Sequence, residues 1–514
     1  MKKILLLTVG YLLSQSILAQ EPSDALRFSW TVPSGTARQQ AIGGAMGSLG
    51  GDISAAYVNP AGLAFYKTGD FVFSPIYQVQ RAKGSYLGYN ESEVKRKMLW
   101  GTTGFVTGSG GNGRKVKSTS FALAYNRSAD FNSNFTYKGA NNTSSYSQKY
   151  LEEIAGDKSG NSVNVNYPFG ASLAFRTLWI DTVGGGTEPN FDFQSRSQNI
   201  LTSAGLLQRQ TFQSRGGIHE FAIAGAINLN DKVMLGGTLG IPVLSYHRNT
   251  QFAEADATEN SSNQFNFATV DEDIDVSGAG INLKAGVIFK PEEYWRIGFA
   301  FHTPTLYSLT DHTMITVTAD VESADGTLFT NNEDITGAPS EFKYTFTSPY
   351  RAIASVSYVL RETQDISQQK GFLTADIEYV NYKASSYEPD QESAYDTGTT
   401  EYLKSLNRAI DNAYKGAFNI RAGGELKFTT FMVRAGAAYY GNPYQNINGE
   451  KGSKLNLSGG IGYRDKGFFA DLTYVHSIQK DTHFPYRLID PSQYYGAQIK
   501  SNVGNVLMTV GLKF

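Results

Sequence analysis

Few residues in this chain have the types and spacing of a reaction centre. The stretch GSGGNG, residues 108–113, has the G-x-G-x-x-G spacing of a phosphate-binding loop. No helix is predicted behind it, and it falls in a turn between two strands, so the pattern argues against nucleotide binding. The histidines show none of the spacings of a zinc site; they are His219, His247, His302, His312, His476 and His483.

Other catalytic chemistry is equally poorly represented. The chain has no cysteine, which excludes thiolate catalysis, cysteine metal sites and disulfides. It has no G-x-S-x-G motif of the serine hydrolases. We therefore predict a non-enzyme with no cofactor and no metal site. An outer-membrane lipolytic enzyme with Ser, His and acidic residues near a barrel rim is the remaining enzymatic alternative.

Charge does not point to a nucleic-acid partner. The chain has 45 Lys and Arg against 47 Asp and Glu, a formal net charge of −2. Proteins that bind nucleic acid usually carry a basic excess. We therefore predict no nucleic-acid partner.

The first residues, MKKILLLTVGYLLSQSILAQ, predict export. Two lysines precede an apolar core, and small residues follow it, as in a secretory signal peptide, which we place at residues 1–19. No later run of roughly 18 apolar residues predicts a membrane-spanning helix. The mean hydropathy of −0.30 still fits a membrane barrel, since such strands show lipid only every second residue.

The rest of the chain alternates between apolar and polar or small residues. In AGINLKAGVIFK, apolar residues from Ile281 to Phe289 occupy every second position, and WRIGFAFH after the turn PEEY repeats the pattern. We predict about fourteen such strands between Thr68 and Phe514. Short and long links alternate between them, as expected when short turns lie at one end of a barrel and long loops at the other.

These observations predict an all-β fold, a transmembrane antiparallel β-barrel of about 14 strands over residues 68–514. The last strand, NVGNVLMTVGLKF, has an apolar face and an aromatic terminus, with Val510, Leu512 and Phe514 on that face. It resembles the signal that the barrel-assembly machinery reads, so we predict that machinery as a partner. The alternative is an ordinary amphipathic edge strand.

Residues 20–67 precede the first strand and have no alternation of their own. A barrel of this size encloses a lumen wider than its side chains fill, so a closed barrel needs a plug. The segment is rich in Gly and Ala, which allow close packing against a wall. Asn59 before Pro60 favours an extended-to-turn conformation. We predict that residues 20–67 form a hatch in the lumen.

The run GTARQQAIGGAMGSLGGDISAAYVNPAGLAFY resembles the hatch of the FadL family of outer-membrane transporters. Asn59, Pro60 and Ala61 correspond to the Asn-Pro-Ala triplet of that hatch, and we predict a gating role for them or, equally, a turn that only packs. The segment FKPEEYWRIGFAFHTPTLYSLTD is also similar to the middle hairpin of the family. The resemblance covers nearly all of the mature chain.

The resemblance implies passive uptake of long-chain fatty acids or other hydrophobic compounds through a hatch-gated barrel in the bacterial outer membrane. The implied partners are a hydrophobic small molecule and outer-membrane lipid. The ligand is expected to leave when the hatch shifts, sideways into the bilayer. A carrier barrel that binds secreted proteins through its long loops is the alternative within the same family.

Two departures from the family stand out. The longest loop, about 138–208, follows the third predicted strand, whereas the ligand-gathering loops of the family follow later hairpins. The third strand of the family is kinked inward, but here STSFALAYNRSADFNSNF lacks Pro and Gly. A β-bulge near Asn126 to Asp130 is predicted in its place.

Candidate ligand contacts come from two segments. In the long loop, YPFGASLAFRTLWIDT predicts an apolar helix starting at Pro168, which packs on the rim or lines a greasy groove. The resemblance points also to the start of the hatch, ALRFSWTV. A second helix, TEYLKSLNRAIDNAYKG, is predicted to cap another loop. The candidate contacts are Phe28, Trp30, Phe169, Leu173, Arg176 and Trp179.

Overall fold

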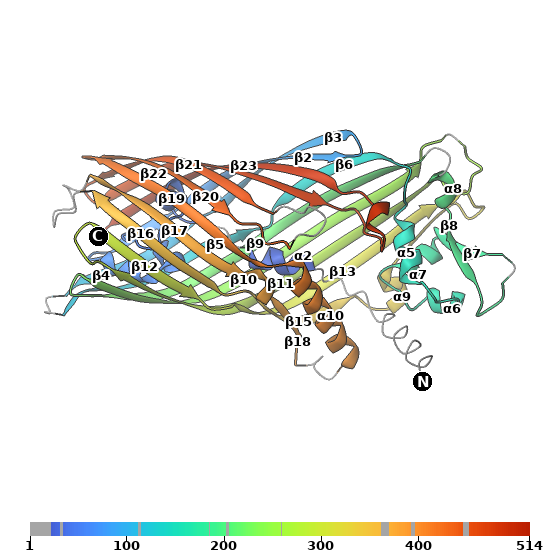
Figure 1. Cartoon of the computed structure of the whole chain (residues 1–514), viewed down its shortest axis with the longest axis horizontal. Helices are drawn as coiled ribbons and strands as arrows, with labels where there is room; N and C mark the ends of the chain where they lie inside the picture. The colour runs from blue at the N-terminus through green and yellow to red at the C-terminus, as the bar shows by residue number, and fades with distance from the viewer. Residues whose placement is uncertain are drawn as a thin grey trace.

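A computed structural model describes residues 22–30, 34–111, 115–184, 186–201, 205–258, 260–360, 370–391, 396–445 and 452–514. The predicted signal peptide, residues 1–19, lies outside these residues. The chain forms a closed antiparallel barrel of 14 strands (Figure 1). The first strand pairs with the last, Asp70 opposite Lys513, which closes the ring.

Six of the fourteen barrel strands are interrupted and carry two labels, and the count agrees with the prediction. In chain order the strands are β1 (Asp70–Phe73) with β2 (Pro75–Tyr86), β3 (Tyr89–Trp100) with β4 (Thr103–Gly110), β5 (Val116–Asp130) with β6 (Ser133–Asn141), β9 (Leu206–Leu229), β10 (Val233–Asp256), β11 (Phe267–Phe289), β12 (Trp295–His302) with β13 (Leu306–Asp320), β15 (Glu341–Thr347) with β16 (Arg351–Leu360), β17 (Gly371–Asn381) with β18 (Ser386–Pro389), β19 (Gly416–Phe428), β20 (Phe431–Tyr440), β21 (Lys454–Asp465), β22 (Phe468–His483) and β23 (Ala497–Lys513).

The alternation predicted from the sequence places apolar side chains outside the barrel. In β12, the outward-facing Phe299 is 56% exposed, whereas Arg296, on the opposite face of the strand, is 7% exposed. This is the reverse of a water-soluble sheet protein, in which such a phenylalanine would face the core. An outward apolar face and an inward polar face are what a membrane barrel requires.

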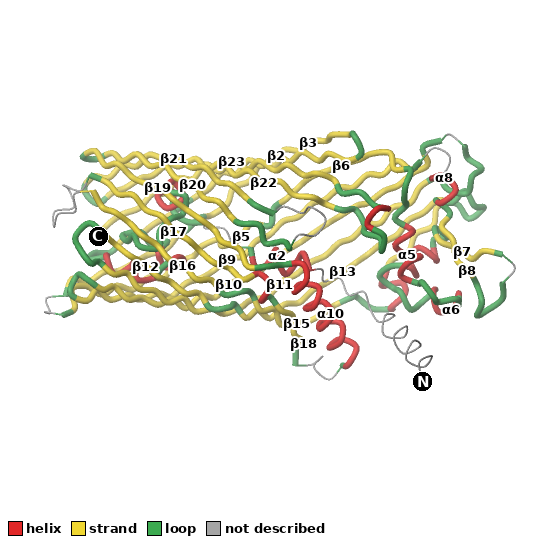
Figure 2. The backbone as a smooth tube through the Cα atoms, in the orientation of Figure 1, coloured by secondary structure: helices red, strands yellow, loops and turns green. Residues whose placement is uncertain are grey.

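The predicted alternation of short and long links is also present. Asn230 and Asp231 both have positive φ, as the two central residues of the tight turn between β9 and β10 require. Figure 2 shows such short connections at one end of the barrel and the longer, helix-containing loops at the other. The predicted link from Arg361 to Lys370 lies mostly outside the described residues.

The segment before the first strand lies inside the ring. We call residues 34–67 the hatch segment; it contains α3 (Ala37–Ala41), α4 (Ala55–Val58) and the 3₁₀ helix η1 (Pro60–Phe65). α3 contacts β20 to β23, whereas η1 contacts β5, β9, β10 and β11 across the lumen. Before it, α2 (Pro22–Ser29) packs against the loop helix α10 (Thr397–Ala413).

The longest loop folds into a small unit over the long-loop end, which we call the loop cap, residues 142–201. It contains α5 (Ser147–Glu153), α6 (Gly160–Val163), α7 (Ala171–Arg176), β7 (Ile180–Val183), β8 (Asp192–Ser195) and α8 (Gln198–Leu201). The remaining loop elements are β14 (Thr327–Asn331), α9 (Asn332–Thr336), η3 (Tyr382–Ala384) and η4 (Pro491–Gln493).

The predicted helix from Pro168 is shorter than expected. α7 begins at Ala171, and the chain leaves it at Leu178, which has a φ of +60°. This turn lets Trp179 enter the core beside Tyr146 and Tyr150 instead of continuing around a helix. Burial of one large aromatic side chain therefore prevails over the helical pattern.

The second predicted loop helix is confirmed as α10. Asp396 caps its start by accepting hydrogen bonds from the backbone N–H groups of Gly398 and Thr399. Leu403, Leu406 and Ile410 form its buried face, as predicted. No helix within the described ranges is long and apolar enough to cross a membrane.

The loop cap contains a carboxyl group that makes its packing depend on pH. Burial raises the pKa of Glu153 to about 7, although its carboxylate accepts a hydrogen bond from the Ala171 backbone N–H at 2.9 Å. The folded cap therefore holds a proton on Glu153 that the unfolded chain releases near its ordinary pKa of 4.5. The stabilisation is fully present below pH 4.5 and is lost as the pH rises through about 7.

We expect hydrogen-exchange protection of residues 147–176, corrected for intrinsic rates, to be higher at pH 5 than at pH 8. Glu153→Gln keeps an acceptor for the Ala171 N–H and cannot titrate, so it should flatten this pH profile. An unchanged profile in the variant would assign the pH dependence to another group.

Candidate functional site

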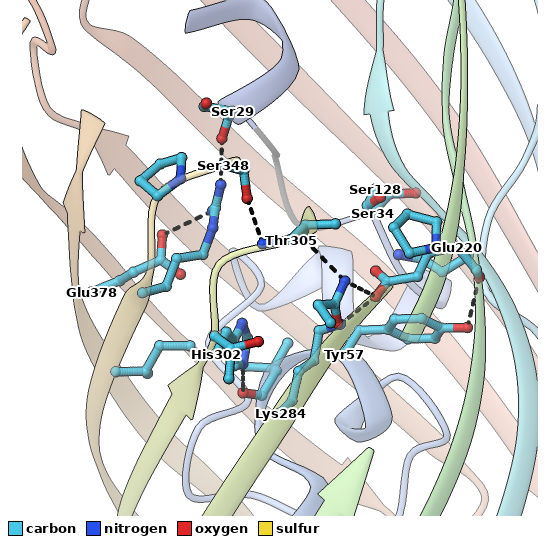
Figure 3. Close-up of a pocket in the computed structure, with 18 of the residues that line it drawn as sticks. Ser29, Ser34, Tyr57, Ser128, Glu220, Lys284, His302, Thr305, Ser348 and Glu378 are labelled. Carbon is cyan, nitrogen blue, oxygen red and sulfur yellow. Dashed lines mark hydrogen bonds and ion pairs between the residues drawn. The ribbon is translucent and has the colours of Figure 1, made fainter. Parts of the chain in front are cut away.

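A cavity lies in the lumen where α2 and the hatch segment face the barrel wall (Figure 3). Phe28, Tyr57, Val58 and Ile353 provide apolar surface, whereas the strands provide mostly polar groups. The residues that line it are Phe28, Ser29, Ser34, Gln39, Tyr57, Val58, Asn126, Ser128, Glu220, Pro242, Asn282, Lys284, His302, Thr303, Thr305, Tyr307, Ser348, Pro349, Arg351, Ile353, Glu378 and Arg421.

The charged groups of the cavity are paired with one another. Lys284 forms an ion pair with Glu220. Arg351 lies 3.7 Å from the Glu378 carboxylate and donates a hydrogen bond of 2.5 Å to the Ser29 carbonyl in α2. Buried charges need such partners. The pairs fix the polar wall and bring α2 into contact with it.

Within the described ranges, no three or more His, Asp or Glu side chains gather in a way that would hold a metal ion. The cavity offers a surface for binding, with one apolar side and one polar side.

The apolar side is built around Phe28. Its ring lies 5.9 Å from the ring centroids of Phe131, Tyr246 and Phe346, so it forms the middle of an aromatic cluster. Phe28, predicted as a ligand contact, thus lines the cavity. Trp30, the other predicted residue of this segment, instead packs on Tyr382.

The wall beside the cavity is distorted. The register between β5 and β9 shifts between Arg127 and Ala129, so Ser128 has no partner residue on β9. This is the β-bulge predicted near Asn126 to Asp130. On the partner strand, Gly216 has a φ of +114° and accepts a hydrogen bond from the Phe131 N–H, just beyond the bulge. The Gly-Gly pair at 216 and 217 was the sequence signal for this feature.

The backbone ladder between the second and third barrel strands ends close to this bulge. β4 pairs with β5 from Gly110 to Thr103, but no ladder joins β3 to β6, both of which are fully described. β6 lies against the inner face of β2: a Cβ on Gly84 of β2 would lie 2.6 Å from the carbonyl of Thr136 in β6.

Side chains span the separation between β3 and β6. Lys95 donates to Asn134 at 2.5 Å, and Lys138 forms an ion pair with Glu91 at 2.7 Å. Partly exposed contacts of this kind contribute little stability compared with a continuous ladder. This stretch is therefore a weak place in the barrel wall, next to the cavity.

Asn59 holds the hatch segment in place through both ends of its side chain. It is fully buried; its amide nitrogen donates to the Gly47 carbonyl at 2.6 Å, and its oxygen accepts from the Ala61 N–H at 3.1 Å. Longer contacts of 3.3 and 3.4 Å reach the carbonyls of Val287 and Phe299 in the wall. Only a side chain with a donor and an acceptor makes this set.

Glycines in the wall make room for this segment. A Cβ on Gly286 would lie 1.8 Å from the Asn59 side-chain oxygen, one on Gly236 2.3 Å from the Pro60 backbone, and one on Gly298 2.1 Å from the Gly47 carbonyl. The three glycines belong to the adjacent strands β10, β11 and β12. They form a seat for the hatch segment that sequence reasoning did not identify.

Asp376 is a second anchor that sequence reasoning missed. Its buried carboxylate accepts hydrogen bonds from the backbone N–H groups of Met46 at 3.0 Å and Gly47 at 3.1 Å, and from the Ser355 hydroxyl at 2.6 Å. The only signal was an acid at an inward position of the strand FLTADIEYV. Carboxylates that accept backbone N–H bonds are strong anchors.

The predicted contacts in the loop cap lie apart from this cavity. Leu173 and Trp179 are fully buried in the core of the cap, and Phe169 packs against that core. The Arg176 side chain contacts Asn164 and the Asp334 carbonyl. None of the four is among the cavity-lining residues, so the structure does not bring them together with Phe28.

Replacing the Asp376 anchor should loosen the hatch segment. Asp376→Asn removes the charge that holds the Met46 and Gly47 N–H groups, so we expect their amide exchange to quicken about tenfold or more. Hydrogen exchange of the folded barrel measures it, with Asp275→Asn on the outer face of β11 as the control. Equal protection in both variants would contradict the anchoring role.

The comparisons with known proteins agree with this architecture at the level of the fold. No family model matches the chain, and the curated proteins contain no significant match. Among solved structures, a FadL homologue of Pseudomonas aeruginosa is 14% identical, with 94% of this chain and 99% of that chain covered and a TM-score of 0.53.

The toluene transporter TodX of Pseudomonas putida is 11% identical, with 94% of this chain and 99% of that chain covered and a TM-score of 0.50. Identities this low show a shared fold and nothing of shared substrates. The predicted resemblance to the FadL family is thereby confirmed at the level of the fold, and the chain has a barrel of the FadL type.

Proposed function

We propose that this chain is an outer-membrane transporter that takes up long-chain fatty acids or other hydrophobic compounds passively. One observation carries the proposal: the lumen cavity reaches Asn126 and Ser128 of β5, beside a stretch of described wall where two neighbouring barrel strands lack a backbone ladder. A compound held there has a short path into the bilayer. The apolar outer surface supports the membrane placement.

In this proposal the hatch segment closes the end of the lumen that lies towards the short turns, which we call the floor. Asn59 and Asp376 tie the hatch segment to itself and to the wall, whereas β3 and β6 are joined only by side chains. The ligand therefore leaves sideways, between β3 and β6, because fewer hydrogen bonds must be broken there than in the hatch segment. In this proposal Asn59, Pro60 and Ala61 hold the hatch segment against the three wall glycines and so keep the floor closed.

α2 is the element that the ligand displaces when it binds in the cavity. Phe28 occupies the middle of the aromatic cluster, and Arg351 is bonded to the Ser29 carbonyl at the end of α2. An apolar chain that displaces Phe28 gains the same aromatic surroundings. A carboxylate that takes the place of the Ser29 carbonyl gains a stronger, charge-assisted bond to Arg351. The proposal thus favours ligands with an acidic head and an apolar tail.

Straightening the wall tests the proposed exit. Deletion of Ser128 removes the unpaired residue and restores the register of β5 with β9, so the wall should close and uptake of labelled oleate should fall about tenfold or more. Uptake is measured in Gram-negative cells lacking their own importer, at equal outer-membrane abundance. Ser128→Ala keeps the bulge and should transport normally.

Undiminished uptake by an inserted barrel without Ser128 would contradict the sideways route. Absence of oleate uptake by the unmodified chain would contradict the fatty-acid assignment.

A further inference from the structure

Three lysines form a row on the outer face of the barrel. Lys83 in β2 pairs in register with Lys500 in β23, and Lys500 pairs with Lys480 in β22. All three residues are exposed and alternate with inward-facing neighbours. Like charges directly opposite each other destabilise a sheet, so this arrangement costs stability in the absence of an anion.

Within the described ranges, no carboxylate forms an ion pair with the row. Arg81 on β2 and Arg96 on the adjoining β3 are exposed on the same face and extend the positive charge. Among the described residues, none of these five cations forms an ion pair with Asp or Glu. The outward positions of β2, β3, β22 and β23 contain no acidic residue.

The row lies at a definite depth in the membrane. Along β23 the outward side chains are apolar from Leu512 to Val506 and polar beyond, up to Lys500. Tyr77 and Tyr474 flank Val506 at the boundary, as in the aromatic girdles of membrane barrels. With about 3.3 Å per residue and a strand tilt of about 40°, Lys500 lies about 30 Å above Leu512.

Lys500 lies six residues beyond Val506, so the same rise and tilt place the row about 15 Å above this aromatic boundary, towards the end with the long loops (Figure 1). β2 and β22 flank β23 there, and neighbouring strands are about 4.8 Å apart. The three lysines therefore span about 10 Å along the headgroup layer, enough to meet a headgroup with more than one phosphate.

We propose that Lys83, Lys480 and Lys500, with Arg81 and Arg96, form a binding site for the phosphate groups of an outer-leaflet membrane lipid. The proposal rests on the membrane placement given under the proposed function, but not on transport. Phosphates fit because the site offers several cations and no acceptor, and because a membrane-facing surface meets lipid headgroups before any soluble anion.

The test measures binding of a phosphorylated glycolipid to the purified full-length barrel in detergent, by native mass spectrometry. Bis-phosphorylated lipid A and its chemically dephosphorylated form are the probes. The triple variant Lys83→Gln, Lys480→Gln, Lys500→Gln should bind the phosphorylated lipid about tenfold more weakly or worse. The control Lys158→Gln, Lys383→Gln, Lys404→Gln changes the net charge equally on the loops and should bind normally.

We expect the unmodified barrel to prefer the phosphorylated lipid and the row variant to lose that preference. Equal binding of both lipids, equal loss in the control, or equally tight binding of inorganic pyrophosphate would overturn the lipid site. The assay contains no transported compound, so its result is independent of oleate uptake. Unfolding temperatures of the lipid-free variants exclude loss of the barrel as the cause.

Discussion

The buried backbone of the hatch segment must find hydrogen-bond partners in the barrel wall, and much of the structure follows from this constraint. A segment with so little regular structure leaves many N–H and C=O groups to satisfy away from water. The wall supplies short hydroxyl side chains for them. Thr473 bonds to the Ala37 carbonyl at 2.7 Å, Ser118 to the Ala64 carbonyl at 2.7 Å, and Thr238 to the Ala56 carbonyl at 2.9 Å.

The same constraint explains the wall composition beneath the cavity. Hydroxyls reach the hatch segment only where the backbones come close, which requires glycine at the contact points. Gly423 and Gly436 pair in register on β19 and β20, and a Cβ on either would lie within 2.5 Å of the Ile42 backbone. Because the hatch segment is fixed to the wall in this way, the side wall near Ser128 is the more weakly bonded boundary of the lumen.

Much of the architecture was predictable from the sequence because it depends on periodicity. Strand alternation gave the barrel, the link lengths gave its two ends, and a Gly/Ala-rich run without alternation gave the lumen segment. These signals are local and repeat along the chain. The bulge near Ser128 was predicted from the family resemblance, since the residues around Ser128 contain neither Pro nor Gly.

The contacts that define the candidate site were less accessible. Asp376 and Gly286 are separated from the hatch by more than two hundred residues, and nothing local marks either as a contact. Trp179 was predicted to lie on a loop helix as a candidate ligand contact, whereas its burial in the loop cap depends on a positive φ at Leu178 after the helix has ended. Tertiary packing of this kind overrides local propensity.

The central claim is that the floor of the lumen stays seated while a compound leaves through the side wall. The chain has no cysteine, so a disulfide can be introduced cleanly at Ser48 and Ser355, whose hydroxyl oxygens lie 2.7 Å apart. Oleate uptake by the double-cysteine variant is measured oxidised and reduced. The account predicts equal uptake in both states; loss of uptake on oxidation, restored by reduction, would show that the floor must move.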